Sequence, residues 1–360
     1  MRSHRSRATH RTAIAVAACL ALAVLGACSS DETSSSEGEG GGESVVLVTY
    51  DSYALPEDAA AAFEERTGAT IEVVAAGDSG TMLTSALLSA GAPEGDVIFG
   101  IDNTLATRAL SEDLLEPFRP DALADVPERY LLDGEAGERL VPIDTGDVCM
   151  NLDQRWFSEQ GVALPTTLEQ LTEPAYRDLV VVESPVTSSP GLAFLIGTVA
   201  RYGEDGWLDY WQRLGDNGLR VRPSWDDAYY SDYTVSGGDR PIVLSYASSP
   251  PVELVFAEGA FTEPPSTVML DSCAAQVEYA GVLRGAEHPE LARELVDFML
   301  SPEWQEALPM SNFVFPVLDV PLPEEFATWA QRAEDPLQLP PATVDAQRET
   351  WIEQWREQME

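Results

Sequence analysis

The chain has 360 residues, with 61 Asp and Glu against 21 basic residues that are all Arg, and its formal net charge is −40. So negative a chain repels nucleic acid and anionic lipid surfaces, which excludes functions that need a basic face and predicts no nucleic-acid partner. Two of its three histidines, His4 and His10, stand at the N-terminus and leave too few for a histidine-rich metal site, while the absence of Lys excludes Schiff-base chemistry.

The N-terminus has the pattern of an export signal. Four Arg precede an apolar run over residues 13–25 that is too short to span a bilayer permanently, and the run ends in Leu25-Gly26-Ala27-Cys28. This spacing is typical of a bacterial lipoprotein processing site, where the mature chain begins at a diacylated cysteine. We expect residues 1–27 to be removed and Cys28 to anchor the exported protein in the lipid bilayer, at the outer face of the cell membrane. The alternative is an ordinary signal peptide with a chance cysteine.

Residues 28–44 are rich in Ser, Gly and Glu and predict a flexible tether. The hundred residues after it predict an open, doubly wound α/β domain. Apolar and alternating runs favour strands over 45–48, 70–74 and 96–100. Helices are expected from Pro56 to a stop at Gly68, and over 81–90.

A second α/β domain is predicted over residues 146–265, because about 315 folded residues exceed what one core usually organises. Strands are expected over 179–182 and 242–246, and a helix over 191–202. Further helices are expected over 289–300, after the cap Ser301-Pro302, and in the tail from 345.

With Cys28 lipidated, Cys149 and Cys273 are left in an oxidising compartment. They form either a disulfide or two buried thiols, and the compartment favours the bond. Closing so long a loop would restrict the unfolded chain by about 4–5 kcal/mol in the loop-entropy model.

Ligands of open α/β sheets bind beyond the carboxyl ends of the strands, and several loops at such places are polar and aromatic. They are Tyr50-Asp51-Ser52-Tyr53, residues 77–81, Ile101-Asp102-Asn103, residues 187–191 and residues 246–250. Ser188 and Ser189 at a helix start would attract phosphate or carboxylate, although a simple N-cap is commoner. A capping box from Ser224 would set Trp225 and Tyr229 on one face, which is usually core packing.

If that face opens on a cleft, Trp225, Tyr246 and Tyr50 would each attract an organic cation by about 0.5–2 kcal/mol. The carboxylates of Asp78 and Asp102 would complete such a site. Rings and acids select a cation and the serine-lined helix start selects an anion, so the loops together fit a ligand with both charges, such as thiamine phosphate.

Seven stretches match those of a known family in the same order. They are Thr49-Tyr50-Asp51-Ser52, Gly100-Ile101-Asp102-Asn103, Val141-Pro142-Ile143-Asp144, Thr187-Ser188-Ser189-Pro190-Gly191-Leu192, Ser224-Trp225-Asp226-Asp227-Ala228-Tyr229, Leu244-Ser245-Tyr246-Ala247-Ser248-Ser249-Pro250 and Gln347-Arg348-Glu349-Thr350-Trp351. From Val45 to the C-terminus the chain resembles the thiamine-binding substrate-binding proteins of ABC importers. The resemblance implies a monomeric receptor, not an enzyme, that needs no cofactor and hands thiamine or a thiamine phosphate to a membrane permease.

The fold implied is the two-lobed, type 2-like periplasmic-binding-protein fold, α/β in both lobes, with two chain crossings and the ligand closed between the lobes. We expect residues 45–145 and 270–320 in lobe 1, residues 146–269 in lobe 2, and residues 321–360 as a helical segment that packs on both.

The resemblance also implies ligand contacts, residue by residue. These fall on Asp78, Ser79, Ser188, Ser189, Trp225, Tyr246, Ala247, Ser248 and Ser249, with Tyr50 as a stacking partner. Three positions depart from the family and bear on ligand choice, namely Phe313 where a Trp commonly stacks, Asp147 where an aromatic is common, and Thr145 where a Tyr is common. Asp147 either faces the cation or is a solvated loop acid.

Three alternatives stay open from the sequence. The adjacent Tyr229-Tyr230 would suit a ferric-ion receptor of the same fold, and the acids would suit a polyamine receptor. Gly77-Asp78-Ser79-Gly80 copies the nucleophile tetrapeptide of trypsin-like proteases, but that activity would need His288 as its base, and we interpret the match as coincidence.

Overall fold

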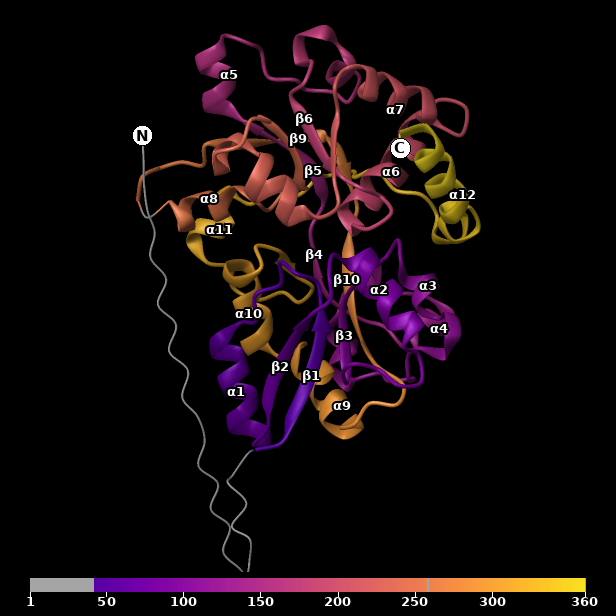
Figure 1. Cartoon of the computed structure of the whole chain (residues 1–360). Coiled ribbons are helices and arrows are strands. Elements are labelled where there is room, and N and C mark those ends of the chain that lie inside the picture. The colour runs from indigo at the N-terminus through magenta and orange to yellow at the C-terminus, as the bar shows by residue number, and fades with distance from the viewer. Residues whose placement is uncertain (1–41, 258, 360) are drawn as a thin grey trace, which may run out of the picture. The chain divides into compact units, whose positions relative to one another are not determined.

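The computed structural model describes residues 42–257 and 259–359 (Figure 1). The predicted signal peptide, the predicted lipidation at Cys28 and nearly all of the predicted tether lie outside the described residues. The described part contains two mixed β-sheets with helices around each, which confirms the predicted α/β class.

The first sheet has the strand order β11-β4-β10-β3-β1-β2. Its strands are β1 (Ser44–Thr49), β2 (Thr70–Ala75), β3 (Val97–Asp102), β4 (Val141–Thr145), β10 (Val277–Val282) and β11 (Phe315–Pro316). The helices that belong with it are α1 (Glu57–Thr67), α2 (Ser79–Leu88), α3 (Ala106–Ala109), α4 (Gly134–Gly137), α9 (Pro289–Phe298) and α10 (Pro302–Ser311). Strands β1, β2 and β3 are parallel, whereas β10 is antiparallel to both β3 and β4.

Local chemistry explains where the helices of this lobe begin and end. Gly68 ends α1 with a φ of 79°, a left-handed conformation that glycine adopts without steric cost. Helix α2 begins at Ser79, two residues before the predicted start, because the Asp78 side chain caps it by accepting the Ser79 N–H. The predicted cap of α10 is confirmed, since the Ser301 hydroxyl accepts the N–H of Trp304.

The second sheet has the order β7-β6-β8-β5-β9. Its strands are β5 (Val148–Asp153), β6 (Val180–Glu183), β7 (Arg220–Arg222), β8 (Ile242–Tyr246) and β9 (Ser266–Ala274). The helices around it are α5 (Gln154–Gln160), α6 (Ser189–Tyr202), α7 (Trp207–Asp216) and α8 (Pro250–Phe256).

The chain passes between the sheets at two short crossings. The first lies between the end of β4 at Thr145 and the start of β5 at Val148, and the second lies between Ala274 and Val277. The predicted boundary at residue 270 is therefore several residues too early, because β9 pairs with β5 through Ala274 and belongs to the second sheet. The disulfide that the sequence favours is present beside both crossings, where it joins Cys149 to Cys273 with an S–S distance of 2.05 Å.

The C-terminal segment contains α11 (Glu324–Trp329) and α12 (Pro341–Met359). Helix α12 packs on α7 (Figure 1). The ring centroids of Trp355 and Trp211 are 5.6 Å apart, with an interplanar angle of 89°. It also contacts the first lobe, since Arg348 donates to the carbonyl of Thr104 at 3.0 Å. Among the described helices, none combines the length and the apolar character that a membrane span requires.

Candidate functional site

A cavity of about 130 Å³ is lined by residues of both lobes and by six aromatic side chains. The lobe 1 residues in its lining are Tyr50, Ser52, Ala54, Glu278, Ser311, Asn312, Phe313 and Val314, and those of lobe 2 are Trp225, Tyr230, Tyr246, Ser249, Val252 and Phe256. Five of the predicted ligand contacts therefore share one cavity, namely Tyr50, Trp225, Tyr246, Ser249 and Phe313.

Tyr50 is fixed in the first loop after β1. Its ring lies against Gly100, where a Cβ atom would come within 2.4 Å of Tyr50 Cδ1, so only glycine leaves room for the ring. Its hydroxyl donates to Glu278 Oε2 at 3.3 Å. Tyr50 thus links an aromatic face of the cavity to a carboxyl group.

Trp225 is held from three directions. Its ring stacks on Tyr229 with centroids 4.6 Å apart and planes 15° apart, which confirms that the two share a face. Its Nε1 donates to Ser245 Oγ at 3.0 Å and its backbone N–H donates to Asp78 Oδ2 at 3.0 Å. Half of the predicted capping box is present, because Ser224 Oγ accepts the N–H of Asp227, while the Asp227 carboxylate accepts from the Ser224 hydroxyl and not from its N–H. One face of the Trp225 ring is therefore covered by Tyr229, and the rest of the ring lines the cavity in a fixed orientation.

Phe313 reaches the cavity through an unusual backbone conformation. Its φ is 54°, which a bulky residue rarely adopts. Asn312 holds this turn against the loop after β1, since its side chain accepts the N–H of Ala54 at 3.0 Å and donates to the Ala54 carbonyl at 2.9 Å. Strained positions of this kind cluster at ligand sites.

The acid of the cavity is Glu278, paired across the sheet with Asp144. The two residues lie opposite each other in the antiparallel pairing of β10 with β4, and both are buried. Burial raises the pKa of Asp144 to about 8. Burial, and then the negative charges of Asp144 and Asp102, raise the pKa of Glu278 well above its usual range. The pair therefore holds a proton at neutral pH that a bound cation would displace.

Asp78 bridges the lobes and does not line the cavity. Its carboxylate accepts the N–H groups of Ser79 at 2.7 Å, Trp225 at 3.0 Å and Ser189 at 3.4 Å, and these residues come from both lobes. Burial raises the pKa of Asp78 to about 6, although the three backbone donors oppose the shift. The Asp78 carboxylate therefore connects the two lobes through hydrogen bonds.

Asp102 and the two serines at the start of α6 lie in the same buried network. Asp102 accepts from Thr104 at 2.9 Å and from Gln276 Nε2 at 2.9 Å, and Gln276 Nε2 lies 3.0 Å from Ser189 Oγ. Ser188 and Ser189 are each only 1% exposed. As ligand contacts these residues stay predictions, and in the structure they form the interface between the lobes.

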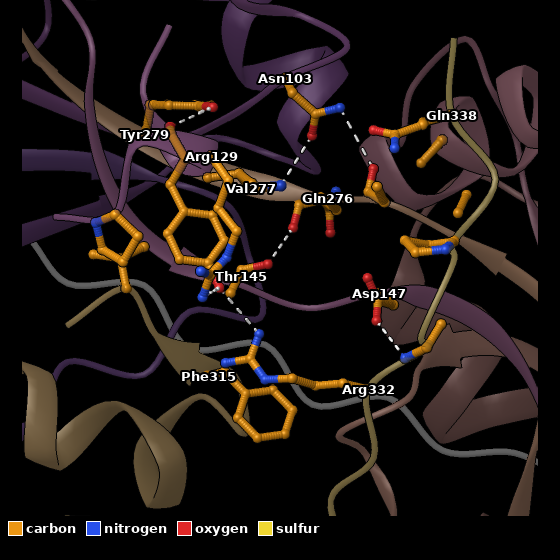
Figure 2. Close-up of a pocket in the computed structure, with 18 of the residues that line it drawn as sticks. Asn103, Arg129, Thr145, Asp147, Gln276, Val277, Tyr279, Phe315, Arg332 and Gln338 are labelled. Atoms are coloured by element: carbon orange, nitrogen blue, oxygen red, sulfur yellow. Dashed lines mark hydrogen bonds between the residues drawn. The ribbon is translucent and has the colours of Figure 1, made fainter. Parts of the chain in front are cut away.

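The other predicted contacts also lie behind the lining. Ala247 and Ser248 are fully buried beside it. Tyr229 supports Trp225 and donates its hydroxyl to Glu253 at 3.2 Å. Asp147 lies in a different and larger cavity of about 740 Å³, where its Oδ2 accepts the N–H of Ala333 at 2.8 Å (Figure 2). Thr145 lines that second cavity as well.

Among the lining residues that sequence reasoning did not assign to this cavity, an acid and two aromatic rings matter most, and one of the rings, Tyr230, was named only for the ferric-ion alternative. The acid is Glu278, which carries the charge of the cavity. The sequence feature that could have identified it is an acidic residue in the strand that follows the second crossing. Tyr230 lies edge-on to Trp225 with ring centroids 5.3 Å apart, and Phe256 is 66% exposed and faces Phe313 at 6.2 Å. Neither ring directly follows a strand, so the expectation that ligand contacts lie in the loops after strands did not identify them.

The geometry also bears on the alternatives. Tyr229 donates its hydroxyl to Glu253 and does not line the aromatic cavity, so only Tyr230 of the adjacent pair reaches that cavity. No cluster of three or more His, Cys, Asp or Glu suited to a metal occurs in residues 42–257 and 259–359.

Ser79 begins the helix at the carboxyl ends of β1 and β2, whereas the backbone N–H of His288 binds Asp96 at the opposite end of β3. The protease-like tetrapeptide is thus separated from the histidine it would need.

Two α/β lobes joined by two crossings, with an aromatic cavity lined from both, define a two-lobed solute-binding protein. The model of the family described as bacterial extracellular solute-binding protein matches residues 93–333, and the chain belongs to this family.

Relatives of known name share most of the chain. It is similar to the thiamine-binding periplasmic protein of Salmonella typhimurium, with 30% identity over 322 residues that cover 87% of this chain and 92% of the relative. It is similar to the protein of the same name from Escherichia coli, with 29% identity over 323 residues and the same two shares. A solved structure named periplasmic thiamin binding protein matches with a TM-score of 0.79 and 27% identity, over 90% of this chain and 98% of that one. These likenesses confirm the family resemblance inferred from the motifs.

Proposed function

We propose that this protein captures thiamine or a thiamine phosphate outside the cytoplasm and delivers it to the membrane permease of an ABC importer. It acts as a monomeric receptor and catalyses no reaction. Cys28 carries the lipid that holds it in the bilayer at the outer face of the cell membrane. The names of its relatives support the ligand, and the sequence pattern at Leu25-Gly26-Ala27-Cys28 supports the anchor.

The observation that carries the ligand proposal is the set of aromatic faces around Glu278. A thiazolium or protonated aminopyrimidine ring is flat and cationic, and such a ring is attracted by π faces and by a carboxylate. Tyr50, Trp225, Tyr246 and Phe313 supply the faces, and Glu278 with Asp144 supplies the negative charge. A flexible polyamine would gain little from the stacking surfaces, so the rings favour thiamine over a polyamine.

The start of α6 bears on the phosphate esters. Its N–H at Ser189 already faces the Asp78 carboxylate, which takes the place that an anionic ligand group would occupy. A phosphate would meet that negative charge, so we expect free thiamine to bind at least as tightly as its mono- and diphosphate.

Trp fluorescence and calorimetric titration of the purified chain test the proposal. The ligands are thiamine, its mono- and diphosphate, spermidine and ferric citrate. Saturable thiamine binding with a dissociation constant of about 1 μM or below is expected, together with much weaker spermidine binding. Tighter binding of spermidine, or a visible charge-transfer band with ferric citrate and no thiamine binding, would overturn the proposal.

A further inference from the structure

A second cavity lies behind the crossing strands, on the side away from Glu278. Val277 and Tyr279 line it, whereas Glu278 between them lines the aromatic cavity, because alternate residues of a strand point to opposite faces. Thr145 at the end of β4 lines it too, and the volume is about 740 Å³. Figure 2 shows these residues on one wall and the segment after β11 on the other.

Two arginines meet in this cavity without a carboxylate partner. Arg129 Nη2 donates to the Tyr130 hydroxyl oxygen at 3.0 Å, and Arg332 Nη1 donates to the same oxygen at 3.3 Å. Neither has a carboxylate oxygen within the 4.0 Å of an ion pair among the described residues, although most other arginines of this acidic chain do. Two like charges are thus held together with no carboxylate in ion-pair contact with either.

The aromatic rings beneath the arginines fix the orientation of both guanidinium groups. Arg332 lies over the Phe315 ring with its guanidinium carbon 3.7 Å from the centroid, as Figure 2 shows, and Arg129 lies 4.4 Å from the centroid of Tyr130. A guanidinium has five N–H donors, and each of these two uses one on Tyr130. The remaining donors form planar forks that match carboxylate or phosphate oxygens.

The acids of the lining form no ion pair with these arginines, although the positive charge of Arg332 opposes the rise that burial causes in the pKa of Asp147. Asp319 and Glu334 lie in the lining but outside ion-pair distance, and the Asp147 carboxylate is held by the N–H of Ala333. The rest of the wall includes apolar side chains such as Leu318 and Leu339, which suit the carbon skeleton of a small molecule.

We propose that the cavity behind the crossings binds a small organic oxyanion, with Arg129 and Arg332 gripping its phosphate or carboxylate group and the apolar wall contacting its carbon skeleton. This site goes beyond the proposed thiamine site and does not depend on it, since the two cavities lie on opposite faces of the same strands. Phosphate and carboxylate ligands share the chemistry that the two forks recognise.

Calorimetric titration of the purified chain at low ionic strength tests the site, with citrate and glycerol 3-phosphate as separate probes. We expect one saturable site with a dissociation constant of about 1 mM or below for at least one probe, and the tighter probe identifies the anion class. Arg129→Gln and Arg332→Gln should each weaken that probe at least about tenfold, and Arg332→Lys should weaken it less, because Lys keeps the charge without the fork.

Arg177→Gln is the matched control, because Arg177 is exposed, has no ion pair among the described residues and lies outside the cavity. It should leave the affinity for the probe unchanged, and all four variants should bind thiamine as the unaltered chain does. Absence of saturable binding of both probes would overturn the proposal, as would equal losses in Arg177→Gln and the two cavity variants.

Discussion

Replacing Trp225 by Ala removes an aromatic ring of the cavity that is held in place through both its side chain and its backbone. The stacking on Tyr229 and the bond from Nε1 to Ser245 are lost, while the backbone N–H to Asp78 is kept, so the contact between the lobes survives. The effect on the ligand can therefore be separated from lobe closure.

The magnitude follows from the face that Trp225 turns toward the cavity. A cation over an indole ring gains about 1 kcal/mol, and covering about 50 Å² of apolar ring face adds about 1.3 kcal/mol. The sum is about 2 kcal/mol, and every 1.4 kcal/mol is tenfold in affinity. Trp225→Ala should therefore weaken thiamine binding at least about tenfold, whereas Trp225→Phe should cost about threefold, because a ring face is kept.

Isothermal calorimetry at pH 8 measures both changes. Trp156→Ala is the matched control, since Trp156 is half-buried in the same lobe but does not line the cavity. Unchanged thiamine affinity in Trp225→Ala, or an equal loss in Trp156→Ala, would remove Trp225 from the ligand site and refute the stacking argument.

The remaining predictions concern the carboxyl groups and the disulfide. Thiamine affinity should rise from pH 6 to pH 8, because burial raises the pKa of Asp144 to about 8 and the pair becomes more negative as it loses protons. Glu278→Gln should weaken binding at pH 8 about tenfold and flatten this pH dependence in calorimetry. Asp78→Asn should weaken thiamine about tenfold by leaving a backbone donor between the lobes unpaired, with a lower melting temperature in differential scanning calorimetry. Replacing both Cys149 and Cys273 by Ser should lower the free energy of unfolding in urea titrations by about 4–5 kcal/mol in the loop-entropy model.

Each of these has an outcome that contradicts it. A pH-independent affinity in the unaltered chain would show that the pair carries no titrating proton at the site. Equal thiamine affinity and melting temperature in Asp78→Asn would show that the bridge between the lobes contributes nothing to closure. An unfolding free energy unchanged by the double Ser variant would show that the bond does not constrain the unfolded chain.

Local sequence patterns located the elements well. The run over 242–246 became β8 with the predicted bounds, because four of its five residues are apolar or aromatic and it is bounded by Pro241 and a serine-rich loop. Trp225 and Tyr229 stack as their four-residue spacing predicted, since that spacing puts two side chains on one helical face.

What the sequence could not supply is which side chains converge from distant segments. Asp78 was expected to face a cation, yet backbone donors from the other lobe surround it, and no local pattern contains them. Glu278 was missed because its role depends on lying opposite Asp144, which is set by the register of β10 on β4. Asp147 was expected either to face the cation or to be a solvated loop acid, and in the structure it lies in the first crossing and lines the other cavity.

The strands β4 and β10 keep the carboxyl groups of Asp144 and Glu278 on the face of the sheet away from Arg129 and Arg332. A strand has a side-chain period of two, so Glu278 cannot share a face with Val277 or Tyr279, and the wall that excludes the acid is the wall facing Arg129 and Arg332. A shift of one residue in the pairing of β10 would exchange these faces. It would put a carboxylate beside the arginines, where they would pair, and it would leave the aromatic cavity without the charge that distinguishes a cation from a neutral ring. The proposed cation site and the proposed anion site therefore both depend on the register that sets Glu278 opposite Asp144.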